Sequence, residues 1–213
     1  MTSRRPPAEP AATFPVHALS ADTWPAFEAL ALRHNGVWNG CWCTWFHSRE
    51  LLRPGESGRE FKQRLVKERK AHAALVFDGE GPDAEAIGWA EYGPPDELPR
   101  IYHRKEIEAR DEPAPDYRIT CFFVDRRYRR KGVAAVALDG VVRLVAEAGG
   151  RVLESYPRDT NGARMSASFL YNATRSMFER AGFSYIAPKG QFNCIMRLTV
   201  PGARRARSRG SNR

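Results

Sequence analysis

Long apolar runs and paired cysteines are both scarce in this chain of 213 residues. No apolar stretch approaches the ~20 residues of a membrane-spanning helix, and the opening MTSRRPPAEPAATFP lacks the apolar core of a secretory signal. The 4 cysteines are too few for a disulfide framework in a chain of this size. We therefore expect a cytoplasmic protein with reduced thiols.

Cysteine spacing also argues against a bound metal. Cys41 and Cys43 form one close pair, with His47 as the near histidine. A structural zinc site commonly needs two such pairs, or one pair with suitably spaced histidines. We predict no metal site, and we expect Cys121 and Cys194 to be small core residues.

Acidic residues are missing from the end of the chain. Residues 200–213 hold five arginines and no acid, which leaves +4 of the net charge of +9 for residues 1–199. A Gly/Ser/Arg segment buries too little apolar surface to fold, so we predict disorder for 200–213 and for the Pro/Ala-rich residues 1–12. One domain over 13–199 follows, because this length is marginal for two cores. Weak contact of the tail with nucleic acid is an alternative use of its charge.

Hydrophobic periodicity predicts mixed secondary structure within residues 13–199. Strands are expected near 14–19, 73–77, 86–92, 117–124, 151–156, 183–186 and 192–199, and helices near 22–33, 59–71, 132–148 and 174–182. A Gly/Asp-rich turn suggests an antiparallel hairpin between the second and third strands. The polar, proline-rich stretch 94–115 is an excursion of the kind that tends to be functional or mobile.

The stretch CFFVDRRYRRKGVAAVALDG combines an apolar strand, five cations, a glycine and an amphipathic helix. Gly132 permits a tight turn, and backbone N–H groups of about residues 129 to 134 are left to converge on an anion at the helix start. Arg129, Arg130 and Lys131 add positive charge there. This pattern predicts an anion-binding turn, with a solvated basic turn or a nucleic-acid patch as the alternative.

Arg129-Arg130-Lys131-Gly132-Val133-Ala134 resembles the Arg/Gln-x-x-Gly-x-Gly/Ala signature of the GNAT superfamily of acyl-CoA-dependent N-acyltransferases. A second element, Met177 to Phe183, resembles the family's later helix end and strand. The resemblance implies an α+β GNAT fold. Its mixed, mostly antiparallel sheet would have six to seven strands, about four helices and splayed central strands. It also implies acetyl-CoA, or a close acyl-CoA, as donor, held by residues 129–134 through its pyrophosphate.

The resemblance also implies how the donor's pantetheine arm is held. Phe123 and Val124 would contact it through the main chain of a bulged central strand. A backbone N–H of that strand would polarise the thioester carbonyl.

Acid and base candidates match the family only in part. The position that often carries a tyrosine acid is Phe178, which cannot donate a proton, so Tyr171 is the substitute candidate. The family's strand glutamate is missing, and Glu91 on a neighbouring strand is the best available base. Packing of Tyr171 beside Phe169 and solvent exposure of Glu91 are the competing interpretations, and water can carry the proton instead.

Trp38, Trp42 and Trp45 cluster where family members line the acceptor pocket, and GCWCTWFH resembles a bacterial subgroup with a Cys-Trp-Cys segment. These aromatics are substrate-binding candidates for an apolar or cationic acceptor, or else they form core packing. The sequence thus predicts acetyl transfer to a primary amine of a small molecule or peptide. A basic nucleic-acid-associated module and a non-catalytic acyl-CoA-binding fold are the alternatives.

Overall fold

A single sheet organises the chain in the computed structural model, which describes residues 14–160 and 170–203. Its seven strands lie in the order β1-β2-β3-β4-β5-β7-β6. They are β1 (Val16–Ala18), β2 (His72–Asp78), β3 (Glu85–Gly93), β4 (Tyr117–Val124), β5 (Gly150–Ser155), β6 (Ser184–Lys189) and β7 (Asn193–Pro201). All neighbouring pairs are antiparallel except β4 and β5, which run parallel. The predicted α+β class, strand number and β2–β3 hairpin are confirmed.

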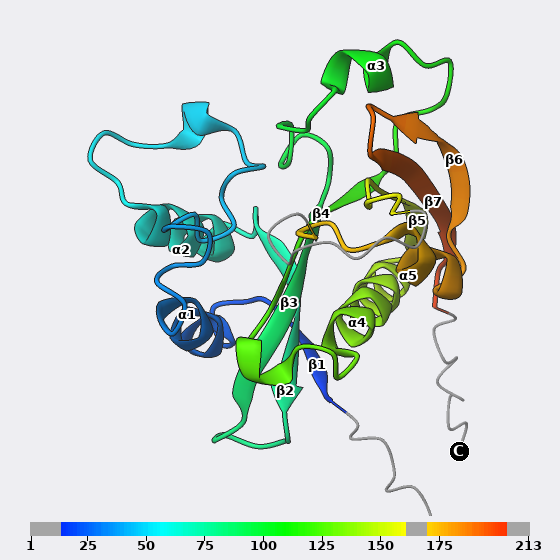
Figure 1. The fold of residues 1–213 in the computed structure, drawn as a ribbon. Coiled ribbons are helices and arrows are strands. Elements are labelled where there is room, and N and C mark those ends of the chain that lie inside the picture. Colours follow the sequence, from blue (N-terminus) through cyan, green and yellow to red (C-terminus); the bar gives the residue numbers. More distant parts are fainter. Residues whose placement is uncertain (1–13, 161–169, 204–213) are drawn as a thin grey trace, which may run out of the picture.

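Helices cover both faces of the sheet (Figure 1). α1 (Trp24–Leu32) and α2 (Gly58–Lys67) lie on one face, and α4 (Val133–Glu147) and α5 (Arg175–Arg180) lie on the other. Single-turn helices occur at Arg49–Leu51 (η1) and Arg126–Tyr128 (η2). α3 (Arg104–Glu108) interrupts the 94–115 excursion and was not predicted; it has no buried residue, so its sequence carries no apolar periodicity.

Alternation along β3 and β4 builds two separate cores. Trp89 and Phe123 pack with α1 and α2, whereas Ala90 and Phe122 pack with α4 and α5. Successive side chains of a strand point to opposite faces, so a strand buried on both sides reads as a continuous apolar run. This is why Cys121 to Val124 is uniformly apolar in the sequence.

The two central strands separate after a short stretch of pairing. β4 and β5 pair through Tyr117 to Ile119 of β4, and the pairing stops there. Next to this point β4 carries a bulge, because Glu91 is opposite Cys121 and Tyr92 is opposite Ile119, which leaves Thr120 without a partner on β3. The predicted splay is therefore present, and it opens the sheet toward α4 and α5.

The structure shows where the cysteines lie and how apolar its helices are. All 4 cysteines are free, and Cys121 and Cys194 are buried. Within residues 14–160 and 170–203, no helix combines the length and apolar character needed to cross a membrane. The predicted cytoplasmic location stays a prediction.

Candidate active site

Most backbone amides of the turn between β4 and α4 have no hydrogen-bond acceptor among the described residues. Gly132 caps α4 with a left-handed φ of 81°, and a Cβ placed there would meet nothing within 4 Å. Within the described part of the chain, the amides of residues 129, 130 and 132–134 have no hydrogen-bond acceptor, whereas Lys131 N–H donates to the Tyr128 carbonyl at 3.4 Å. Free amides at a helix start, together with the helix dipole, favour an anion.

Asp125, the last residue before this turn, stabilises it through hydrogen bonds and ion pairs. Its side chain is 2 % exposed, accepts from the Arg127 N–H at 2.9 Å, and also pairs with the Arg127 and Arg33 guanidinium groups. Burial opposes the charged form of Asp125, but its hydrogen bonds to Arg127 outweigh burial and hold the pKa of the carboxyl below its usual range. Arg127, one of the five cations of the turn, therefore has a structural role, and its charge is already neutralised.

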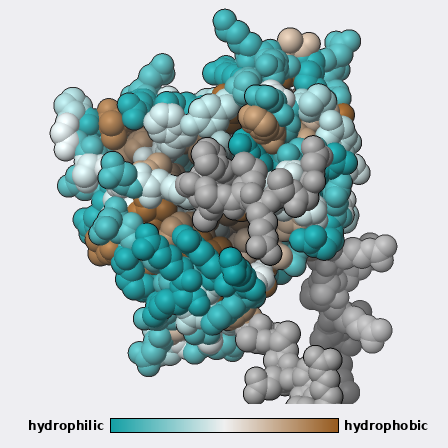
Figure 2. All heavy atoms as spheres, viewed as in Figure 1, coloured by the Kyte–Doolittle hydropathy of each residue, from teal (hydrophilic) through white to brown (hydrophobic). Residues whose placement is uncertain are grey.

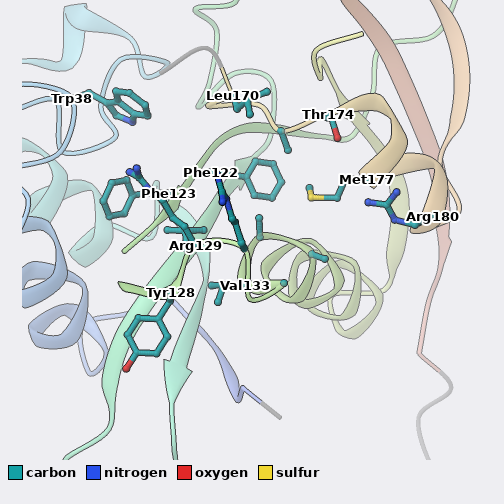
Figure 3. Close-up of a pocket in the computed structure, with 16 residues that line it drawn as sticks. Trp38, Phe122, Phe123, Tyr128, Arg129, Val133, Leu170, Thr174, Met177 and Arg180 are labelled. Carbon is teal, nitrogen blue, oxygen red and sulfur yellow. The ribbon is translucent and has the colours of Figure 1, made fainter. Parts of the chain in front are cut away.

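A cavity of about 570 Å³ lies between β4, the basic turn, α4 and α5 (Figure 3). Trp38 and Phe123 border one side of it, and Met177 and Arg180 of α5 border the other. Apolar surface is gathered on this face of the molecule above a hydrophilic lower part (Figure 2). The predicted donor-binding residues that line it are Phe123, Val124, Arg129, Arg130, Gly132, Val133 and Ala134. Lys131 instead lies with its Nζ 4.7 Å from the Tyr128 ring centre.

The edge of β4 that faces this cavity offers peptide groups. The Phe122 N–H donates to the Tyr171 carbonyl at 2.6 Å, so residue 122 turns its backbone away from β3. Asp125 N–H donates to Ile87 on β3, and alternation then directs the backbone of Phe123 to β3 and that of Val124 to the cavity. Phe123 contributes its ring and Val124 contributes its peptide.

A second cavity, of about 200 Å³, adjoins the first and shares Trp38 with it. Its wall is aromatic and thiol-bearing: Trp38, Cys41, Cys43, Trp45, Phe46, Tyr102, Cys121 and Tyr171. Trp38 and Trp45 are each 41 % exposed, in keeping with a wall position. Trp42 is 7 % exposed, stacks with Trp24 in the core, and lines neither cavity of the described structure.

Tyr171, the predicted acid, is partly buried next to a cavity. Tyr171 lines the second cavity, and burial raises the pKa of its hydroxyl to about 12, so it stays protonated near neutral pH. Phe178 is fully buried against Phe122 and Phe183. Asn172 lies beside Tyr171 and donates its side-chain amide to the Tyr156 carbonyl at 3.3 Å.

Glu91 is fully buried in a network that sequence reasoning missed. Lys62 Nζ donates to its Oε1 at 2.6 Å, Thr120 Oγ1 donates to its Oε2 at 2.8 Å, and His47 Nε2 lies 3.5 Å from Oε1. Burial would raise the pKa of Glu91, but Lys62 and then His47 outweigh burial and hold it at about 2. Burial and Lys62 lower the pKa of His47, which favours its neutral form. Glu91, the predicted base, is thus an ionised carboxylate whose oxygens accept hydrogen bonds from Lys62 and Thr120, and it is not exposed to solvent.

The sequence does carry a signal for this network. Lys62 stands among Phe61, Leu65 and Val66 on the buried side of α2, where a charged residue requires a partner. Within the described residues, no group of three or more His, Cys, Asp or Glu side chains is arranged to hold a metal ion.

The family model described as Acetyltransferase (GNAT) family matches residues 34–183. This chain therefore belongs to the GNAT acetyltransferase family. No curated protein matches its sequence.

Several solved structures are similar to this chain at low sequence identity. One is described as histone acetyltransferase HPA2 and related acetyltransferase from Corynebacterium glutamicum, with 16% identity, a TM-score of 0.48, and 90% of this chain and 97% of that chain covered. A second is the ribosomal-protein-S18-alanine N-acetyltransferase from Escherichia coli, with 13% identity, a TM-score of 0.45, and 90% and 96% covered. A third is a mutant AtaT toxin bound to the C-terminus of the antitoxin AtaR and acetyl-CoA, with 11% identity, a TM-score of 0.43, and 88% and 93% covered.

Proposed function

We propose that this protein is an acetyl-CoA-dependent N-acetyltransferase that transfers the acetyl group directly to a primary amine. One observation carries the proposal: the cavity of about 570 Å³ joins free amides at the start of α4, two arginines and the open edge of β4. A coenzyme A donor has the matching parts, a charged pyrophosphate and an amide-bearing arm that can pair with a strand.

The residues present fit that donor. The amides of Gly132, Val133 and Ala134 would hold the pyrophosphate, with charge assistance from Arg129 and Arg130. Lys131 would add long-range attraction only. The Val124 peptide would pair with the pantetheine arm, while the Phe123 ring would pack beside it.

Bound acetyl-CoA supplies the acetyl group as a thioester. The Phe122 N–H is the strand amide suited to the acyl carbonyl, because it points away from β3 and already donates to a carbonyl oxygen, that of Tyr171. The acyl carbonyl would take the place of the Tyr171 carbonyl. The Tyr171 hydroxyl, kept protonated by burial, would donate a proton to the leaving sulfur.

Deprotonation of the amine is assigned to water and not to Glu91. A carboxylate whose pKa is held at about 2 and whose oxygens are hydrogen-bonded to Lys62 and Thr120 is a weak base. Glu91 would instead hold Thr120, and with it the bulge of β4, in place. This role makes Glu91 a positioning residue.

The second cavity would receive the acceptor. Its aromatic wall suits an apolar or cationic group, and Trp38 and Trp45 are the substrate-binding candidates, while Trp42 serves the core. We retain the Cys-Trp-Cys subgroup and a single domain as part of this proposal. The domain extends beyond the predicted boundary at residue 199, because β7 runs to Pro201 and Val200 is buried.

The test is calorimetric titration of acetyl-CoA into wild type, Gly132→Trp and Gly79→Trp. Gly79 is a matched control, because it also has a left-handed φ of 90° and open space for a side chain, in the β2–β3 turn. We expect micromolar binding by wild type and Gly79→Trp and its loss in Gly132→Trp. No binding by folded wild type would refute the donor site, and binding without turnover on an amine panel would leave the non-catalytic alternative.

Nucleic-acid binding is tested in the same preparation. Steep salt dependence of DNA or RNA affinity, lost when the turn and the arginine tail are neutralised, would favour the basic module.

A further inference from the structure

A third cavity, of about 220 Å³, lies under the excursion that precedes β4. α3 and the chain after it reach across to the side of β6 and β7 (Figure 1). Three arginines line this cavity, Arg110, Arg118 and Arg197, together with Glu108 and Glu112. Neither the donor cavity nor the aromatic cavity includes these residues.

Arg118 is the unusual member of this set. Its side chain is 9 % exposed, its Nε has no hydrogen-bond partner, its Nη1 donates to the Leu98 carbonyl at 3.5 Å, and the guanidinium also interacts with the uncharged hydroxyl of Tyr156. Within the described residues no carboxylate lies within ion-pair distance of Arg118, whereas Arg110 pairs with Glu112 at 2.5 Å. A buried guanidinium without an anion is costly, so the site has a charge left to balance.

The surroundings of Arg118 increase this imbalance. Lys189 is 5 % exposed and, among the described residues, also lacks a carboxylate partner; burial lowers its pKa to about 8. The buried carboxylate nearby, Glu154, is already bonded to Arg197 Nε at 2.5 Å and to the Tyr156 hydroxyl at 2.5 Å. Each of its oxygens thus already accepts a hydrogen bond. Among the described residues neither Arg118 nor Lys189 forms an ion pair, and Glu106 and Glu154 act on Lys189 only from a longer distance.

We propose that this cavity binds a carboxylate group through Arg118. A guanidinium presents parallel N–H donors that match the two oxygens of a carboxylate. The volume admits a small organic acid or the acidic end of a larger molecule. This site is independent of the donor site proposed above.

The position of Arg118 gives the site a relation to the acceptor. Arg118 and Cys121 stand three residues apart on β4, a separation of roughly 10 Å. Arg118 contacts Leu98, which belongs to the same apolar cluster as Cys121, and Cys121 lines the aromatic cavity. The carboxylate can thus come from an acceptor whose amine lies near Cys121, or from a separate acid.

Binding is tested with succinate, against uncharged succinamide, at constant ionic strength, by titration and by the unfolding temperature. We expect succinate, and not succinamide, to bind wild type and Lys105→Met and to raise their unfolding temperatures. Lys105 is the control, since it is an exposed cation of α3 that does not line the cavity. Arg118→Met should bind succinate at least ~30-fold more weakly.

Two results would overturn the proposal: no response of wild type to succinate, or an equal response of Arg118→Met. Removal of an unpaired buried charge is expected to leave the ligand-free variant folded. If Arg118→Met does not fold, Arg118→Lys keeps the charge but not the paired donors, and it must show the same weakening.

The source of the carboxylate is determined by comparing the rates of acetylation of hexylamine and 6-aminohexanoate, which differ in a terminal carboxylate. A preference for 6-aminohexanoate that Arg118→Met abolishes assigns the cavity to the acceptor. Succinate binding without that preference assigns it to a separate acid. Failure of acetyl-CoA binding would affect the proposed function and leave the succinate result standing.

Discussion

Replacing Lys62 by Met should expose how much the buried pair with Glu91 matters. Both side chains are about 1 % exposed, and the ammonium lies 2.6 Å from the carboxylate. Removal of one partner leaves the other charge buried and unpaired, which lowers the free energy of unfolding by about 3 to 5 kcal/mol. The same change at Lys67, exposed near the end of the same helix, should stay within about 0.5 kcal/mol.

The pH dependence of stability gives a sharper test. The pKa of Glu91 falls from 4.5 to about 2 in the folded protein, which corresponds to about 3 kcal/mol of stability. In wild type this contribution is complete above about pH 4.5 and is lost as the pH falls toward 2. Without Lys62, burial dominates and raises the pKa of Glu91, so Lys62→Met should lose stability as the pH rises above 4.5.

Denaturant unfolding of wild type, Lys62→Met, Lys67→Met and Lys62→Met/Glu91→Gln at pH 5 and pH 8 measures this effect. Burial, the largest cause of the lowered pKa of His47, is still present in Lys62→Met and disfavours a charged imidazole as a replacement for the lost cation. The deficit of Lys62→Met should grow between pH 5 and pH 8, and Gln at position 91 should remove that growth. A deficit below about 1 kcal/mol, or one that does not change with pH, would refute the reasoning.

Two further predictions concern the active site. Arg129→Gln should weaken acetyl-CoA binding about tenfold in calorimetry, since it removes a charge-assisted contact, and Arg126→Gln in the same turn should not; equal losses would indicate a long-range charge effect. Tyr171→Phe should lower kcat about 100-fold at pH 7 to 9 with little change in the KM of acetyl-CoA, while Tyr185→Phe on β6 should leave kcat unchanged; retained kcat would remove the acid role from Tyr171.

Local patterns predicted the parts of the fold that depend on neighbours in sequence. The apolar run ending at Asp125 located β4 as Tyr117–Val124, and the glycine after the cations located the start of α4. Ser57 and Glu60 form the capping box that starts α2, one residue before the predicted start. The short α3 was not predicted, because none of its residues is buried and His103, before it, makes no side-chain cap.

Of the candidate site, the sequence named in advance mainly residues that line the larger cavity. A loop and a strand edge are continuous in sequence, so their residues could be named from a motif. The Lys62–Glu91 pair joins residues 29 positions apart. The separation of Trp42 from Trp38 and Trp45 depends on left-handed backbone at Trp38, Trp42 and Cys43. The position of Lys62 on the apolar side of α2 signals that it needs a buried partner, but nothing local in the sequence identifies that partner or the backbone conformation of the tryptophan segment.

The hydrogen bond from Phe122 to the Tyr171 carbonyl has a kinetic consequence. The Tyr171 carbonyl accepts from the strand amide that we propose for the donor's carbonyl, and Tyr171 also lines the second cavity, which we propose for the acceptor. A thioester that takes this amide must first release residue 171, and the wall of the neighbouring cavity then changes. The two substrates should therefore add in a fixed order, donor before acceptor, and a dead-end amine should inhibit uncompetitively with respect to acetyl-CoA.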